Sequence, residues 1–140
     1  MGAWGTGPME NDAALDFAGD LSDGPEDTVT AGLRTAMTGV LDTDDYIEGS
    51  DLDAAIAAAA LVAARIDPAV PIGVNGRDHL GRSPFTVDAD LRDLAARVFT
   101  RAFEPENNEW HELWSDGGSL DEVTAALAPF RAAVDLPTQS

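Results

Sequence analysis

The apolar stretch over residues 52–66 constrains the fold more than any other part of the chain, because it is apolar around most of the helical circumference. Its stripe at helical spacing consists of Leu52, Ile56, Ala59, Ala60, Ala63 and Ile66. We predict a helix that begins at a Ser50 cap and ends before Pro68, since the residue before a proline is pushed out of the helical region. Such a helix belongs at the centre of the protein, where its alanines allow neighbouring helices to approach closely.

Amphipathic segments lie on both sides of this stretch in the sequence. Apolar side chains recur at the spacing of a helix in residues 12–21, 29–41, 91–102 and 120–134, and a shorter helix is expected over residues 108–114. Asn11 is expected to cap the first of these helices, and Pro129 to kink or shorten the last. Residues 69–85 contain three glycines and two prolines, which predict a loop. The sequence therefore predicts an all-α fold: a compact bundle of five or six helices with a long Gly/Pro loop between the third and fourth main helices.

Length and composition fit one globular domain. A chain of 140 residues, of which 44% are hydrophobic, can form one core, so we expect a single domain over residues 1–140 with a frayed tail at residues 136–140. The sequence has no cysteine, which rules out disulfides and a thiol nucleophile. Neither a signal-like N-terminus nor a membrane-length apolar run is present. We therefore expect a cytoplasmic protein that does not bind membranes.

The charge of the chain is strongly negative and unevenly distributed. Twenty-six acidic residues stand against eight basic ones, which gives a net charge of −18. Such a field repels nucleic acids and anionic lipids and attracts basic proteins, although acidity can also serve solubility alone. Residues 10–53 carry thirteen carboxylates and one basic residue, Arg34. We predict a partner-binding surface there, with the candidate residues Asp42, Asp44, Asp45 and Glu48.

The N-terminal residues carry a family resemblance. Met1-Gly2-Ala3-Trp4-Gly5-Thr6-Gly7 and Glu10-Asn11-Asp12-Ala13-Ala14-Leu15-Asp16-Phe17 resemble the start of the bacterial domain of unknown function 4259 family, whose members also have an alanine-rich third helix. Met9 stands where the family often has an aromatic residue, and Phe17 stands where it commonly has Trp, but both keep an apolar side chain. The resemblance implies no activity, because the family has none established. We expect Trp4 to be a packing anchor.

Motifs that would define an active site or a metal centre are incomplete. His111-Glu112 begins like a zincin motif, but Ser115 stands where the second histidine is needed. The Asp42-Thr43-Asp44-Asp45 run has Tyr46 and Ile47 where an EF-hand needs a ligand and a glycine. No nucleophile elbow occurs. We therefore predict no catalytic residue, no metal and no cofactor, and we lean against an enzyme.

Two other groups of residues have alternative interpretations. Residues 73–83 combine glycines with Arg77, His79 and Arg82, residue types that bind anions in a backbone nest, so this segment could serve a small-ligand-binding or hydrolytic protein. Alternatively, it is a solvent-exposed connection whose arginines pair with the acidic surface. Trp110, Leu113 and Trp114 share one face of a helix, which favours core packing, while any exposed part of this cluster would suit partner binding.

The sequence leaves three functional hypotheses. We prefer a non-enzymatic, immunity-like or inhibitor-like protein that docks its acidic half on a basic protein partner. A ligand-binding or hydrolytic protein that uses residues 73–83 is the alternative, and a structural subunit is the third.

Overall fold

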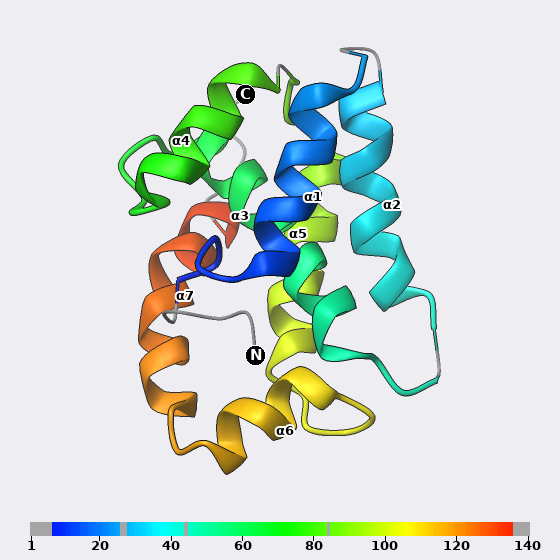
Figure 1. The fold of residues 1–140 in the computed structure, drawn as a ribbon, viewed down its shortest axis with the longest axis vertical. Helices are drawn as coiled ribbons and strands as arrows, with labels where there is room; N and C mark the ends of the chain where they lie inside the picture. The colour runs from blue at the N-terminus through cyan, green and yellow to red at the C-terminus, as the bar shows by residue number, and fades with distance from the viewer. Residues whose placement is uncertain (1–6, 26–27, 44, 84, 136–140) are drawn as a thin grey trace.

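The computed structural model describes residues 7–25, 28–43, 45–83 and 85–135. Seven helices follow one another in this part of the chain: α1 (Asp12–Asp23), α2 (Val29–Leu41), α3 (Gly49–Ile66), α4 (Gly73–Arg82), α5 (Ala89–Ala102), α6 (Glu109–Asp116) and α7 (Leu120–Asp135) (Figure 1). No strand is present among these residues, so the all-α prediction is confirmed. The expectations for Trp4, Asp44 and the tail at residues 136–140 fall outside the described residues.

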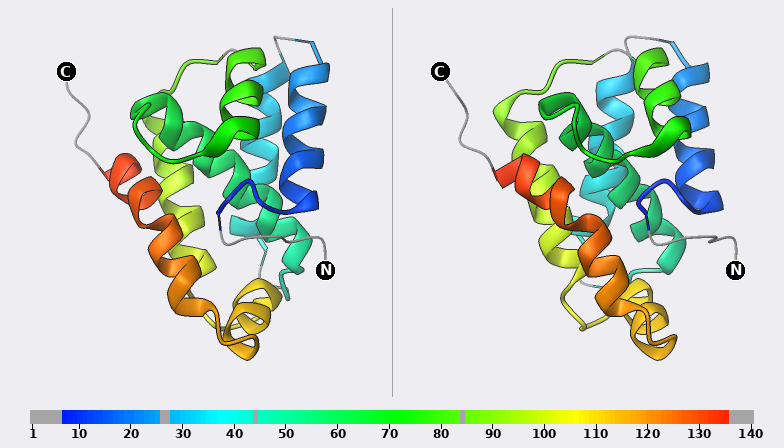
Figure 2. Two further views of the ribbon diagram at one scale, coloured as in Figure 1. Left: turned by 60° about the vertical axis from the view of Figure 1, so that its left-hand side comes forward. Right: turned by 90° about the vertical axis from the view of Figure 1, so that its left-hand side faces the viewer.

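The α3 helix lies at the centre of the bundle, as its apolar circumference predicts. Every residue from 55 to 64 is buried. The helix packs against each of the other six, and Figure 2 shows it between α7 on one side and α1 and α2 on the other. Because most of its buried side chains are alanines, the surrounding helices can pack close to its backbone.

The α4 helix occupies the segment for which we expected a long Gly/Pro loop, and this expectation is wrong. Gly73 has a φ of +84°, a left-handed conformation that favours glycine and turns the chain into the helix. Gly76 packs so closely that an added Cβ would lie 2.4 Å from Cγ1 of Ile72. Arg77 donates hydrogen bonds to the carbonyls of Pro68 and Val70 and so ties α4 to the preceding turn. The described chain therefore has seven helices instead of five or six.

The ends of the other helices agree with the sequence in part. The Asn11 side chain accepts a hydrogen bond of 2.7 Å from the backbone N–H of Ala14, so the predicted cap of α1 is confirmed. The α3 helix begins at Gly49 with Glu48 in the N-cap position, slightly before the predicted Ser50 cap. The α7 helix continues through Pro129 to Asp135, so the proline does not end it.

Enlarging a central alanine of α3 tests the close packing around this helix. Ala59 is fully buried, and Ala59→Leu should lower the free energy of unfolding by about 1–3 kcal/mol or more, because a tightly packed interior has no room for three further carbon atoms. Ala128→Leu on the exposed side of α7 is the control and should change stability by less than about 0.5 kcal/mol. Chemical denaturation measures both, and equal stability of Ala59→Leu and the native chain would contradict the close packing.

Candidate functional site

A backbone bridge fixes the end of the molecule that carries the predicted partner-binding residues. The Ile47 N–H donates to the carbonyl of Asn107 at 2.8 Å, and the Glu109 N–H donates to the carbonyl of Ile47 at 3.0 Å. These two bonds form a parallel bridge between the α2–α3 connection and the start of α6. Two loops that are distant in the sequence therefore hold each other in place.

The buried Asn108 side chain joins the end of α5 to the start of α6. Its amide nitrogen lies 2.9 Å from the carbonyl of Ala102, and within 3.3 Å of the carbonyls of Arg101 and Glu104. Its amide oxygen accepts a hydrogen bond of 2.9 Å from the His111 N–H, which caps α6. One fully buried side chain thus satisfies backbone groups of two helices.

Glu109 connects α6 directly to the first turn of α3. Its carboxylate accepts a hydrogen bond of 2.7 Å from the Gly49 N–H. A negative charge is favourable at this position, because the N–H groups of a helix start form the positive end of its dipole. An added Cβ at Gly49 would lie 3.2 Å from the Glu109 carboxylate and 3.4 Å from Cδ1 of Leu113, so the glycine allows this close approach.

Aromatic packing places α6 against the core. Trp110 is buried, and its ring meets Phe103 edge-to-face at a centroid distance of 5.5 Å and Trp114 at 6.4 Å. Leu113, which the sequence pattern assigned to the same packed face, is 49% exposed. The core-packing interpretation therefore holds for Trp110 and is wrong for Leu113.

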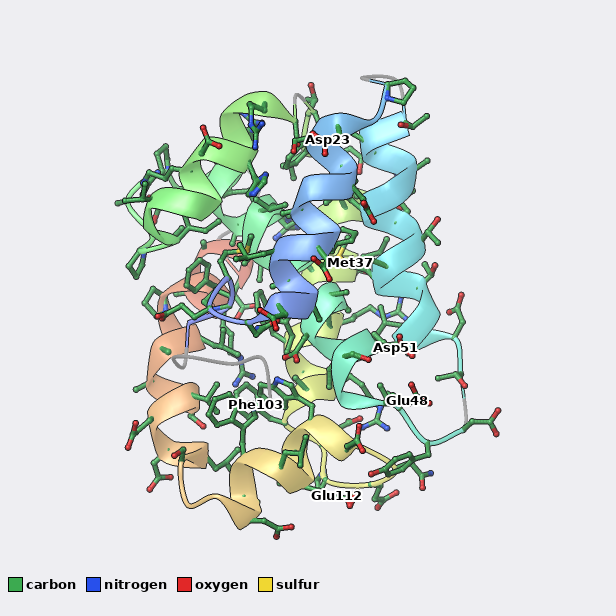
Figure 3. All side chains as sticks on the ribbon, viewed as in Figure 1. Asp23, Met37, Glu48, Asp51, Phe103 and Glu112 are labelled. Atoms are coloured by element: carbon green, nitrogen blue, oxygen red, sulfur yellow. The ribbon has the colours of Figure 1, made fainter. Side chains whose placement is uncertain are left out.

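Exposed side chains at this end form a surface that we call the acidic pole. It consists of Asp45, Tyr46, Glu48, Asp51, Glu112 and Leu113. Figure 3 shows Glu48, Asp51 and Glu112 where the start of α3 and α6 form one end of the molecule. Partial desolvation and the interaction with the nearby Glu112 and Glu109 carboxylates raise the pKa of the Tyr46 phenol.

The structure distributes the predicted partner-binding residues as follows. Asp45 and Glu48 are exposed on the acidic pole, Asp42 is exposed at the end of α2, and Asp44 lies outside the described residues. Sequence reasoning missed Tyr46, Glu112 and Leu113 as part of the same surface. The hydrogen bonds that bring them together link positions 60 residues apart, and no local sequence signal records such a pairing.

The predicted ligand residues Arg77, His79 and Arg82 lie on α4, at the end of the molecule opposite to α6 (Figure 1). Arg77 is bound to the carbonyls before its helix, and Arg82 pairs with Asp78 at 3.2 Å. Nδ1 of His79 lies 3.1 Å from Oγ of Ser22 and 3.3 Å from the Arg82 guanidinium. His79 and Arg82 are brought together, but they lie at the C-terminal end of a helix, where the dipole disfavours an anion.

The described residues lack the side-chain groupings that a metal centre needs. No group of three or more His, Asp or Glu side chains in this part of the chain is placed to hold a metal ion. His79 and His111 do not converge, since α4 and α6 lie at opposite ends of the molecule. None of the described helices is both long enough and apolar enough to cross a bilayer.

Asp53 is a partly buried carboxyl group beside Trp110. Burial raises its pKa to about 6, although a hydrogen bond with Trp110 acts in the opposite direction. The adjoining cavity, lined by Asn11, Ile56 and Trp114 among others, has a volume of about 10 Å³, room for one water molecule at most. A carboxyl group with such a pKa is suited to proton transfer, but this cavity has no space for a substrate.

The fold and the site define a small, acidic, all-α domain with two exposed apolar side chains among the carboxylates of one end. The family described as Domain of unknown function (DUF4259) matches residues 2–126, and the chain belongs to this family. Comparisons with curated proteins and with solved structures give no match.

Substitution of Asn108 tests its role at the acidic pole. Asn108→Ala should lower the free energy of unfolding by about 2–4 kcal/mol, because buried carbonyls lose their donor and α6 loses its cap. Asn108→Asp keeps the capping acceptor but places a carboxyl group against three carbonyls, so it should destabilise at least as strongly. His111→Ala leaves the capped backbone N–H in place and should cost less than about 1 kcal/mol. Thermal unfolding of the three variants checks this order. An Asn108→Asp variant as stable as the native chain would contradict it.

The raised pKa of Asp53 predicts a specific pH dependence of stability. Since the folded state binds this proton more tightly than the unfolded chain does, the Asp53 contribution falls as pH rises from about 4 to 6 and then stays low. Asp53→Asn should therefore stabilise the protein by about 1–3 kcal/mol at about pH 8 and by little at about pH 4.

Denaturant unfolding across this pH range measures the effect of Asp53→Asn. Asp16→Asn, on an exposed position of α1, removes the same charge without the burial and should show no comparable change with pH. If Asp53→Asn raises the free energy of unfolding equally at both pH values, the raised pKa of Asp53 is not the cause.

Proposed function

We propose that this protein is a small, acidic, non-enzymatic binding protein of the cytoplasm, immunity-like or inhibitor-like, that docks on a basic protein partner. The docking surface is the acidic pole together with the exposed Asp42; Asp44, which belongs to the same acidic run of the sequence, lies outside the described residues. The observation that carries this proposal is the combination of several exposed carboxylates with the exposed side chains of Tyr46 and Leu113.

The carboxylates of the acidic pole that take no part in the ion pairs of the described chain support the proposal. They join Arg34 to Asp88 and Asp90, Arg82 to Asp78, Arg97 to Asp93, and Arg101 to Glu104. Asp45, Glu48, Asp51 and Glu112 have no cationic partner in these pairs. Lysine or arginine side chains of a partner would relieve the repulsion among these carboxylates and would be attracted over about a Debye length.

The remaining candidate chemistry gives less support to an enzyme. The cavity beside Asp53 does not admit a substrate, and Arg77 and Arg82 are engaged with carbonyls and a carboxylate of the chain itself. A ligand-binding or hydrolytic role for residues 73–83 stays a prediction without a geometry that favours it. Partner binding, in contrast, needs only the exposed groups that the acidic pole presents.

A capture experiment with two matched charge reversals tests the proposed function. The native chain, Asp45→Lys/Glu48→Lys and Asp16→Lys/Asp20→Lys are immobilised and exposed to a lysate, and bound proteins are quantified by mass spectrometry. Asp16 and Asp20 are exposed on α1, so both double variants change the net charge equally. We expect basic proteins retained by the native chain and the α1 variant to fall at least about tenfold on the pole variant.

The salt dependence of the binding of these retained proteins is a second test. Their binding should weaken as the salt concentration rises, because the attraction between exposed charges is screened. If all three chains capture the same proteins in the same amounts, the acidic pole is not the docking surface.

A further inference from the structure

We infer that the partner presents a basic amphipathic segment whose apolar side chain packs against Tyr46 and Leu113 while flanking arginines pair with Glu48 and Glu112. This inference rests on the proposed function and specifies the chemistry of the partner. It also divides the acidic pole into an apolar centre and a charged rim, which makes the two contributions separable by experiment.

The apolar centre is unusual for this protein. Among the described residues, the large hydrophobic side chains that are exposed are Tyr46 at 48%, Val74 at 86% and Leu113 at 49%. Two of these three lie on the acidic pole, whereas Val74 lies on α4. Contact sites commonly have a few apolar or aromatic anchors that a polar rim shields from water.

Contacts at the start of α3 bring the two anchors together. Leu113 approaches Gly49 so closely that Cδ1 would lie 3.4 Å from an added Cβ. The phenol of Tyr46 lies close enough to Glu112, the residue directly before Leu113 in α6, for this carboxylate to raise the pKa of the phenol. Tyr46 and Leu113 therefore flank the same helix start, with carboxylates of both segments beside them.

The anchors are also held in place before any partner arrives. Ile47, directly after Tyr46, is buried and forms both bonds of the backbone bridge. Glu109 and the buried Trp110, in the turn before Leu113, connect α6 to α3 and to the core. A surface that is already ordered loses little conformational entropy on binding, which favours affinity.

Charge complementarity selects the occupant. A second copy of this chain would bring its own carboxylates against those of the pole, and nucleic acids or anionic lipids would be repelled in the same way. Arginine suits the surface particularly well, since its guanidinium binds carboxylates in a bidentate manner and stacks on aromatic rings such as that of Tyr46. A leucine or similar side chain between the arginines would cover Leu113.

A titration with synthetic peptides, followed by nuclear magnetic resonance of the isotope-labelled full chain, tests the inference. The probe is an amphipathic peptide of about 14 residues, four helical turns, with arginines flanking a stripe of leucines. The control peptide has serine in place of every leucine and keeps the same charge. At about 20 mM NaCl, where screening is weak, the leucine peptide should shift the amide signals of residues 45–51 and 109–113 most strongly.

Substitutions of the anchors separate the apolar centre from the charged rim. Tyr46→Ala/Leu113→Ala should weaken binding of the leucine peptide at least about tenfold, whereas Tyr46→Phe and Val74→Ala should leave it within about twofold. Both anchors are about half exposed, so the signals of the core amides should stay in place in every variant. The serine peptide should bind the native chain at least about tenfold more weakly than the leucine peptide does.

Failure of the inference and failure of the proposed function give different results. If the leucine and serine peptides bind equally well, or if loss of both anchors has no effect while Asp45→Lys/Glu48→Lys abolishes binding, the apolar centre is overturned and the acidic docking surface stands. If the native chain binds neither peptide at low salt, or binds them mainly through the amides of α1, the proposed docking surface itself is wrong.

Discussion

The burial of residues 55–64 of α3 on all sides is the constraint on which the rest of the structure depends. A helical segment with no polar face has to be surrounded, and the other six helices satisfy this requirement by packing against α3. Its alanines determine how near these helices can come, because each larger side chain would push a neighbour outward. The positions of α4 at one end and α6 at the other follow from this central helix.

The two ends of the bundle use their charged groups differently. Near α4, Arg65 and Arg77 donate hydrogen bonds to backbone carbonyls at helix ends and turns, so these guanidinium groups already have partners within the chain. Near α6, Glu109 caps the start of α3, but the carboxylates around it have no arginine of the described chain in an ion pair. At this end, carboxylates outside the ion pairs therefore lie beside two exposed apolar side chains.

The sequence predicts the parts of this fold that depend on local periodicity and capping. The stripes of α2 and α5 and the cap at Asn11 can be predicted from neighbouring residues, since each involves groups within a few helical turns. The α4 helix cannot be predicted in this way. Its Gly76 is required by the close contact with Ile72 and Met9, whereas the local sequence shows only that glycine has a low helix propensity. The same limit applies to the acidic pole. Asp45 and Glu48 are recognisable in the sequence as part of an acidic run. Leu113 shares the helical spacing of the buried Trp110, and it is exposed only because α6 lies at the end of the bundle.

The hydrogen bond between Gly49 and Glu109 has a consequence for how binding and folding are linked. It joins two segments 60 residues apart, so the surface made by Tyr46 and Leu113 exists only when the α2–α3 connection and α6 are both docked. A partner that recognises this surface binds the folded chain and not the unfolded one, and its binding free energy then adds to the stability of the fold. Local unfolding of this end would abolish the surface while the central helix stays folded. The fraction of chains that hold a bound partner is therefore a direct measure of local order at this end.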